Sequence, residues 1–211
     1  MKVIAINGSP HKEGNTYQAL MAVGHVLEAN QIEFELIHVG NKVVRGCLAC
    51  GGCARKKDEK CTNTSDEVNE WIHKMKEADG ILLGSPVYYA GIAGTMKCFL
   101  DRAFCVAGNN GSFFRNKVGA SIVTLRRSGG SSTYDSLNHY LTFSEMILAT
   151  SNYWNIAHGA IQGEVLKDDE GIQIMEILGR KVVWLLQMRE QTKASLQEPE
   201  LPQKIKTNFI R

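Results

Sequence analysis

The chain has 211 residues, of which 44% are hydrophobic and 22% are charged, and its formal net charge at pH 7 is +2. This length suits one well-buried domain and is short for two, and the composition is typical of globular proteins. The small net charge argues against nucleic acid or a membrane as a partner, and no apolar run approaches the roughly 20 residues that span a bilayer. The apolar N-terminal stretch is too short for a signal peptide. We therefore expect a cytoplasmic protein whose cysteines stay reduced.

Short β-branched runs alternate with longer segments of helical periodicity along the chain. The predicted strands are 2–6, 34–39, 80–84, 118–124 and 155–161, and the predicted helices are 15–30, 65–78, 94–107, 132–150 and 171–190. The second helix opens with Thr64-x-x-Glu67, a capping-box pattern. This alternation predicts an α/β fold with a parallel sheet and helices on both faces. Five such units fit a doubly wound, flavodoxin-like sheet of five strands in the order 2-1-3-4-5.

Residues 1–190 are predicted to form this domain, and 191–211, which include Pro199 and Pro202, a C-terminal tail outside it. In a doubly wound sheet, ligands bind beyond the carboxyl ends of the strands, at the switch point between strands 1 and 3. The unusual segments of the sequence should therefore follow those strands, and they do.

The segment GSPHKEGNT, residues 8–16, joins the first strand to the first helix. Its small and hydroxyl residues let backbone N–H groups turn toward an anion at the positive end of the helix. Ser9 and Thr16 add hydroxyl donors, and Asn15 adds an amide. The segment is not a nucleoside-triphosphate loop, because five residues separate its glycines and Asn15 stands where that motif has a lysine.

The segment SPVYYAGIAGTMKCFLDR, residues 85–102, follows the third strand. Pro86 fixes the backbone, Tyr88 and Tyr89 offer flat faces, and Gly91 allows a planar ligand to approach the chain. A flavin ring needs such a slot. The fourth strand leads into residues 124–131, TLRRSGGS, a flexible and positively charged loop.

These segments resemble those of the flavodoxin-like NAD(P)H-dependent FMN reductase family, and the resemblance covers residues 1 to about 190. It implies that FMN binds with its phosphate on the first loop and its ring against the other two, although His11 stands where arginine is frequent. The helix with Met96 to Arg102 would lie at a subunit contact, so a homodimer or homotetramer is expected. The implied FMN contacts are Ser9, His11, Gly14, Asn15, Thr16, Pro86, Val87, Tyr88, Tyr89, Gly91, Thr124, Gly129 and Gly130.

Four of the six cysteines lie within GCLACGGCARKKDEKC, residues 46–61, as Cys47, Cys50, Cys53 and Cys61. A zinc ribbon uses two Cys-x-x-Cys pairs separated by about 15–20 residues, whereas these cysteines form one continuous run. Such a run suits a [4Fe–4S] cluster, and it resembles the cysteine run of the iron–sulfur flavoproteins. Cysteines without metal remain an alternative, since reductases of the same broad family carry cysteines here without a cluster.

The sequence therefore predicts an FMN-dependent oxidoreductase that passes electrons from NAD(P)H to a small acceptor such as a quinone or a flavin. The alternative is an iron–sulfur flavoprotein that transfers electrons, to a redox protein or within a dimer, through a cluster on Cys47 to Cys61. We expect no acid–base catalytic residue, because hydride transfer to a flavin needs none.

Overall fold

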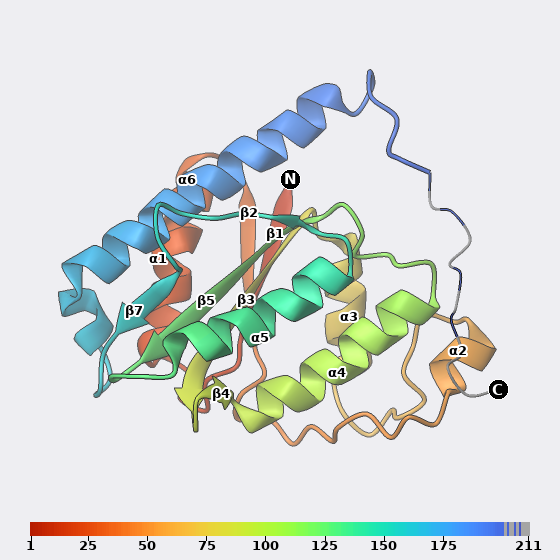
Figure 1. The fold of residues 1–211 in the computed structure, drawn as a ribbon, viewed down its shortest axis with the longest axis horizontal. Helices are drawn as coiled ribbons and strands as arrows, with labels where there is room; N and C mark the ends of the chain where they lie inside the picture. Colours follow the sequence, from red (N-terminus) through yellow and green to blue (C-terminus); the bar gives the residue numbers. More distant parts are fainter. Residues whose placement is uncertain (201, 203–204, 206, 208–211) are drawn as a thin grey trace.

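Seven strands form one sheet in the computed structural model, which describes residues 1–200, 202, 205 and 207 (Figure 1). Their order is β2-β1-β3-β5-β6, with β4 paired to β3 and β7 paired to β5. The strands are β1 (Lys2–Asn7), β2 (Glu33–His38), β3 (Gly80–Tyr88), β4 (Gly91–Ile92), β5 (Val118–Leu125), β6 (Ile147–Leu148) and β7 (Ile156–His158). All pairs are parallel except β3 with β4.

The predicted fold class is confirmed, but the strand count and order need a correction. A short antiparallel strand, β4, is added after β3. The predicted fifth strand is replaced by two short ones: β6 pairs with the start of β5 and β7 with its end. The predicted helix 132–150 also ends early, because Glu145 adopts a left-handed conformation with φ of 55° and turns the chain back toward the sheet.

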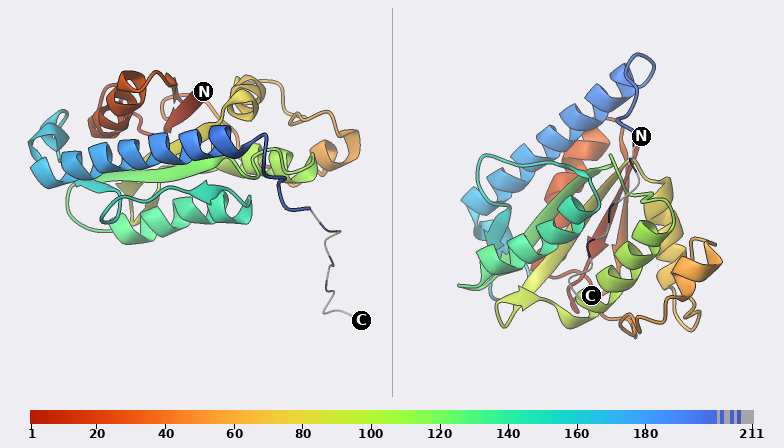
Figure 2. Two further views of the ribbon diagram at one scale, coloured as in Figure 1. Left: turned by 90° about the horizontal axis from the view of Figure 1, so that it is seen from above. Right: turned by 45° about the vertical axis from the view of Figure 1, so that its right-hand side comes forward.

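Helices cover both faces of the sheet. The helices are α1 (Asn15–Ala29), α2 (Gly52–Lys56), α3 (Val68–Glu77), α4 (Gly94–Asn109), α5 (Gly130–Phe143), the 3₁₀-helix η1 (Glu164–Lys167) and α6 (Asp169–Thr192). Buried residues of α1 and α6 form one core cluster, and those of α3, α4 and α5 form another. The left view of Figure 2 shows α1 and α5 on opposite sides of the sheet. No helix in the described part of the chain is long and apolar enough to cross a membrane.

The central strands are buried because helices lie on both sides of them. Every residue of β5 is buried, and so are the first six of β3, which explains why these strands read as continuous apolar runs. The edge strand β2 instead carries Glu33 and Glu35, which both pair with Lys2; charges on an edge oppose pairing with another chain. The sheet therefore fixes the carboxyl ends of β1, β3 and β5 side by side, and the loops that follow them meet at one edge.

The segment that follows α6 makes hydrogen bonds back to the domain. Arg115 donates to the Pro199 carbonyl at 2.8 Å and Asn116 donates to the Glu198 carboxylate at 2.7 Å. These bonds bring residues 198 and 199 back to the loop before β5. The division of the chain at residue 190 stays a prediction.

Candidate functional site

The loops after β1, β3 and β5 touch one another at the carboxyl edge of the sheet. The hydroxyls of Thr16 and Thr124 share a hydrogen bond of 2.7 Å, and both residues are buried. Ser132 at the start of α5 donates to the carbonyl of Ala90 at 2.8 Å. Gly129 lies so close to Ala90 that an added Cβ would come within 2.8 Å of its Cα. The structure thus brings the three predicted flavin segments together.

Local hydrogen bonds of the loop 8–16, and a contact from His38 of β2, hold this loop without capping the start of α1. The amide of Ser9 donates to the Asn7 side chain, and the amide of His11 donates to the Ser9 hydroxyl at 3.2 Å. The His38 ring lies 2.7 Å from the Ser9 carbonyl. Helix α1 begins after Gly14 with no side chain capping its first turn. Uncapped N–H groups at a helix start favour an anion, as the predicted phosphate site requires.

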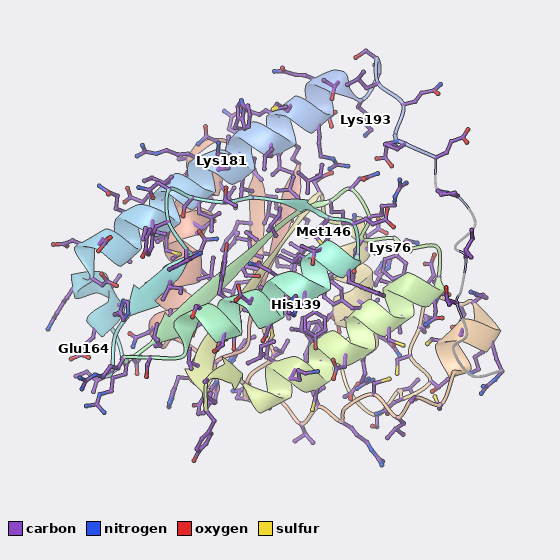
Figure 3. The ribbon with its side chains drawn as sticks, in the orientation of Figure 1. Lys76, His139, Met146, Glu164, Lys181 and Lys193 are labelled. Carbon is purple, nitrogen blue, oxygen red and sulfur yellow. The ribbon has the colours of Figure 1, made fainter. Side chains whose placement is uncertain are left out.

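The side chain of Asn15 is engaged within the chain. Its amide nitrogen donates to the Ile161 carbonyl at 3.0 Å, and its oxygen accepts from the backbone N–H groups of Gly163 and Val165. Glu164, labelled in Figure 3, accepts from the amides of Ala160 and Ile161 and closes the same turn. The Asn15 amide nitrogen has two N–H donors; one is bonded to Ile161, and the other can donate to a phosphate. No local pattern indicates that segment 160–165 borders this loop, because the contact joins residues about 150 positions apart.

The turn between β3 and β4 presents the two tyrosines to solvent. Tyr89 and Ala90 have φ of 49° and 57°, the left-handed pair that a two-residue type I′ hairpin turn requires. Each costs about 1–2 kcal/mol because neither is glycine. Tyr88 is 45% exposed and Tyr89 fully exposed. Strain of this kind is concentrated at ligand sites, and the turn holds two aromatic faces where the predicted flavin ring would lie.

A cavity beside Gly129 and Gly130 contains residues that sequence reasoning missed. Tyr153 and Trp154 line it together with Arg127, and the two rings pack 5.0 Å apart while each stays more than half exposed. A Tyr-Trp pair in the connection between β6 and β7 was the available signal. The other arginine of this loop, Arg126, is exposed.

The four cysteines of the run line one cavity next to α4. Cys47, Cys50, Cys53 and Cys61 share this cavity with Arg102 and Cys105 of α4. The segment is tightly turned: Ala49, Gly51, Lys57 and Glu59 all have positive φ. Gly52 is buried so closely against Thr62 that an added Cβ would come within 2.2 Å of its methyl group. This contact brings the end of the run back to its start.

The thiols of the cavity differ in their surroundings. Cys50 is exposed, and a hydrogen bond from the Thr62 hydroxyl at 3.3 Å, with one from the Gly52 amide, lowers the pKa of the Cys50 thiol. Burial, together with the neighbouring thiols of Cys53 and Cys47, raises the pKa of Cys105 to about 11. Cys105 therefore lies against the cysteine run, although sequence reasoning did not include it.

The arrangement bears on which metal group the cysteines could hold. Among the described residues, no three His, Cys, Asp or Glu side chains are grouped as ligands of a metal ion. One tetrahedral zinc needs thiolates all at about 2.3 Å from a single centre, whereas each thiolate of a cubane cluster binds a different iron. Four cysteines line one cavity with a guanidinium beside them, and this number of thiolate donors suits a cubane cluster.

Helix α4 differs from the surface expected at a subunit contact. Met96, Phe99, Leu100 and Arg102 are buried within the chain itself, so these residues of the predicted contact face inward. Cys98 and Cys105 are partly exposed. A contact through α4 would have to use its outer face, and the contact stays a prediction.

Comparisons with known proteins identify the family of this chain. The family model described as NADPH-dependent FMN reductase matches residues 1–160. An iron-sulfur flavoprotein of Methanocaldococcus jannaschii is 35% identical over 195 residues, which cover 89% of this chain and 98% of the relative. One of Archaeoglobus fulgidus is 28% identical over 207 residues, which cover 98% of this chain and 90% of the relative.

Solved structures share the fold at low sequence identity. RosB has a TM-score of 0.69 and 13% identity, and the match covers all of this chain and 94% of RosB. A flavodoxin from the domain Archaea has a TM-score of 0.60 and 17% identity, with 89% of this chain and 99% of the flavodoxin covered. The resemblance seen in the sequence is therefore confirmed: the chain belongs to the NADPH-dependent FMN reductase family, in the subgroup of the iron-sulfur flavoproteins.

Proposed function

We propose that this flavoprotein oxidoreductase binds FMN at the carboxyl edge of its sheet and holds a [4Fe–4S] cluster on Cys47, Cys50, Cys53 and Cys61. The single observation that carries the proposal is the cavity in which all four cysteines meet beside a buried arginine. The names of the relatives, iron-sulfur flavoproteins, point the same way.

The loops around the FMN site would bind different parts of the cofactor. FMN, when bound, accepts a hydride or electrons and passes them on. The uncapped start of α1 would bind its phosphate, and the loop beyond Thr124 with the strained turn at Tyr88 and Tyr89 would hold the ring. Ser132 supports the strained turn from a separate element, because it donates to the Ala90 carbonyl.

The cysteine cavity would hold the second redox group. A cluster, when bound, exchanges one electron at a time. Cys53 and Cys61 pack against the core cluster of α3 and α4, which would fix two of the four thiolates. Cys47 and Cys50 lie on the exposed side, so electrons could leave toward a redox protein at this surface.

A second candidate is an NAD(P)H-dependent FMN reductase whose cysteines carry no cluster. The cavity beside Gly129 favours it, because the exposed Trp154 and Tyr153 and the charge of Arg127 could take an aromatic, phosphate-bearing donor such as NAD(P)H. Its acceptor would be a quinone, a free flavin or a similar small molecule.

The test is anaerobic production and reconstitution, followed by assays of FMN, iron and acid-labile sulfide. We expect about four iron and four sulfide per chain, and we expect Cys50→Ala to lose both while keeping FMN. Cys98→Ala, which changes a cysteine outside the run, is the matched control and should keep its iron. Wild-type protein that binds FMN but no iron would contradict the cluster and leave the second candidate.

The electron donor is tested separately. Anaerobic addition of NADPH or NADH should bleach the flavin absorption if a nicotinamide is the donor. Trp154→Ala should then slow the bleaching at low donor concentration, whereas Trp184→Ala, an exposed tryptophan of α6, should not. An unbleached flavin would assign the donor role to a redox protein.

A further inference from the structure

Arg102 is the most voluminous of the side chains that the structure buries completely, with 1% of its surface exposed. A guanidinium has five N–H donors, and all five are used. Its Nε donates to the Cys61 sulfur at 3.3 Å. The remaining four N–H groups donate to the carbonyls of Arg45 and Asn63 and to both carboxylate oxygens of Asp66.

These partners lie on both sides of the cysteine run. Arg45 precedes Cys47, whereas Asn63 and Asp66 follow Cys61. One planar group therefore joins the entry and the exit of the segment 45–66. The Asp66 carboxylate is also nearly buried, at 8% exposed, and it compensates the charge of the guanidinium, as a buried arginine requires.

The four backbone and carboxylate bonds fix the plane of the guanidinium, and this plane decides where the fifth donor points. The Nε–H is aimed at the Cys61 sulfur because the other four donors cannot rotate without breaking. Helix α4 supplies the rigid base, since Phe99 and Ala103 on either side of Arg102 are fully buried in the core. The bond to sulfur is thus a consequence of the whole anchor.

We propose that Arg102 is a positioning residue for the cysteine site, which holds both ends of segment 45–66 and donates to the Cys61 sulfur, so that it governs cluster uptake and raises the reduction potential of the cluster. This inference rests on the proposed cluster. A hydrogen bond donated to a ligand sulfur such as that of Cys61 stabilises the negative charge that reduction adds to the cluster. Hydrogen bonds to sulfur are therefore among the interactions that set the reduction potential of a cluster. Lysine cannot replace this arginine, because its ammonium has three donors at one point and no planar fork.

The experiment compares Arg102→Lys and Arg102→Gln with the wild type after anaerobic reconstitution. Arg180→Lys is the matched control, because Arg180 is an exposed, ion-paired arginine of α6. Iron and sulfide content, FMN content and the reduction potential of the cluster are measured for each. We expect both Arg102 variants to keep FMN and to take up less iron. In the variant molecules that hold a cluster, the equilibrium constant for its reduction should fall at least tenfold. For one electron this corresponds to a reduction potential about 59 mV more negative.

Two results would overturn the inference. Iron uptake and potential equal to the wild type in both Arg102 variants would show that the bond to Cys61 has no such effect. Loss of FMN and of helix content in both variants would assign Arg102 to the fold as a whole. The reduction potential separates the proposal from a merely structural role. If Arg102 only held the loop, a variant that still binds the cluster would keep the wild-type potential; if Arg102 donates to the Cys61 sulfur, the potential of that variant falls.

Hydrogen exchange of the cluster-free protein separates this inference from the proposed function. Peptides within 45–66 should exchange faster in Arg102→Lys than in the wild type, because three backbone and carboxylate partners lose their anchor. Wild-type protein that takes up no iron would overturn the cluster and with it the role of Arg102 in the potential. Exchange that is unchanged in Arg102→Lys would overturn the anchoring as well.

Discussion

At the scale of single residues, two buried hydroxyls join the loop after β1 to the end of β5. Thr16 at the start of α1 and Thr124 at the end of β5 are 108 positions apart, yet their hydroxyls lie 2.7 Å from each other in the buried centre of the site. A buried hydroxyl is costly when it loses its partner, whereas the removal of both partners can be nearly neutral. This asymmetry makes the pair a test of how the site is built.

Thr16→Val and Thr124→Val should each lower the free energy of unfolding by about 1–3 kcal/mol, because each leaves one buried hydroxyl without its partner. The double variant should recover most of that loss. Urea unfolding of the four proteins measures the coupling, and fluorescence titration measures FMN affinity. If the Thr16 hydroxyl also binds the phosphate, the double variant regains stability and still binds FMN more weakly. Purely additive losses of stability would contradict the pairing.

Tyr140 on α5 gives a prediction at alkaline pH. Burial and the hydrogen bond that its hydroxyl donates to Asp101 raise the pKa of Tyr140 to about 12, from about 10 in an unfolded chain. Between these values the unfolded chain loses the proton first, so stability from this group is complete below about pH 10 and falls as the pH rises toward 12. The wild type should therefore lose stability relative to Tyr140→Phe across that window, as measured by urea unfolding. If the free energies of unfolding of the two proteins changed in parallel with pH, the raised pKa of Tyr140 would be contradicted.

At the scale of elements, contacts between segments determine where helix α3 starts, which the local sequence pattern did not. The Thr64-x-x-Glu67 pattern predicts a helix start at Thr64, but α3 begins at Val68 and Glu67 makes no side-chain cap. The preceding residues are held instead by Arg102 of α4, which binds Asn63 and Asp66. A buried ion pair and its hydrogen bonds outweigh a capping box, which contributes about 1 kcal/mol.

Gly40 after β2 shows a second contact of this kind. An added Cβ would lie 2.0 Å from the carbonyl oxygen of Ser9, so Gly40→Ala must displace the loop 8–16. We expect a loss of about 1–3 kcal/mol in stability, as for other overpacked sites, together with weaker FMN binding. Gly108→Ala is the control: apart from its chain neighbours and the backbone of its own helix, no atom lies within 4 Å of its added Cβ. Replacing a helical glycine should add about 0.5–1 kcal/mol. FMN affinity equal to the wild type in Gly40→Ala would show that the contact does not shape the site.

At the scale of the whole molecule, α4 supports both candidate sites. Near its start, Met96 packs so closely under Gly8 of the first loop that an added Cβ there would come within 2.6 Å of it. Farther along, Arg102 and Cys105 border the cysteine cavity. One rigid helix therefore holds the two sites at a fixed separation within the chain. The loops of the same two sites also carry exposed apolar residues. Val43 is 94% exposed, Leu48 is 59% exposed and Tyr89 is fully exposed.

The predicted homodimer or homotetramer can be tested at Val43, whose exposed side chain would be covered if the loops of these two sites form the contact. Light scattering should give twice or four times the chain mass of 23.4 kDa. Val43→Glu should shift the protein toward a single chain, because it places a charge in the contact, and the control Trp184→Glu on α6 should not. A mass of one chain at all micromolar concentrations would rule out the assembly.

The sequence by itself determined the fold class, the family and the segments that carry the candidate sites. Alternation of apolar runs and helical periods is a local property, and so are the motifs GSPHKEGNT and CLACGGC, so they could be read without coordinates. Only the tertiary structure decided which side chains meet: Asn15 holds residues 161–165, Arg102 turns inward to Cys61, and Cys105 joins the cysteine run. Each of these contacts joins residues more than 40 positions apart, and no local pattern encodes the packing that selects them.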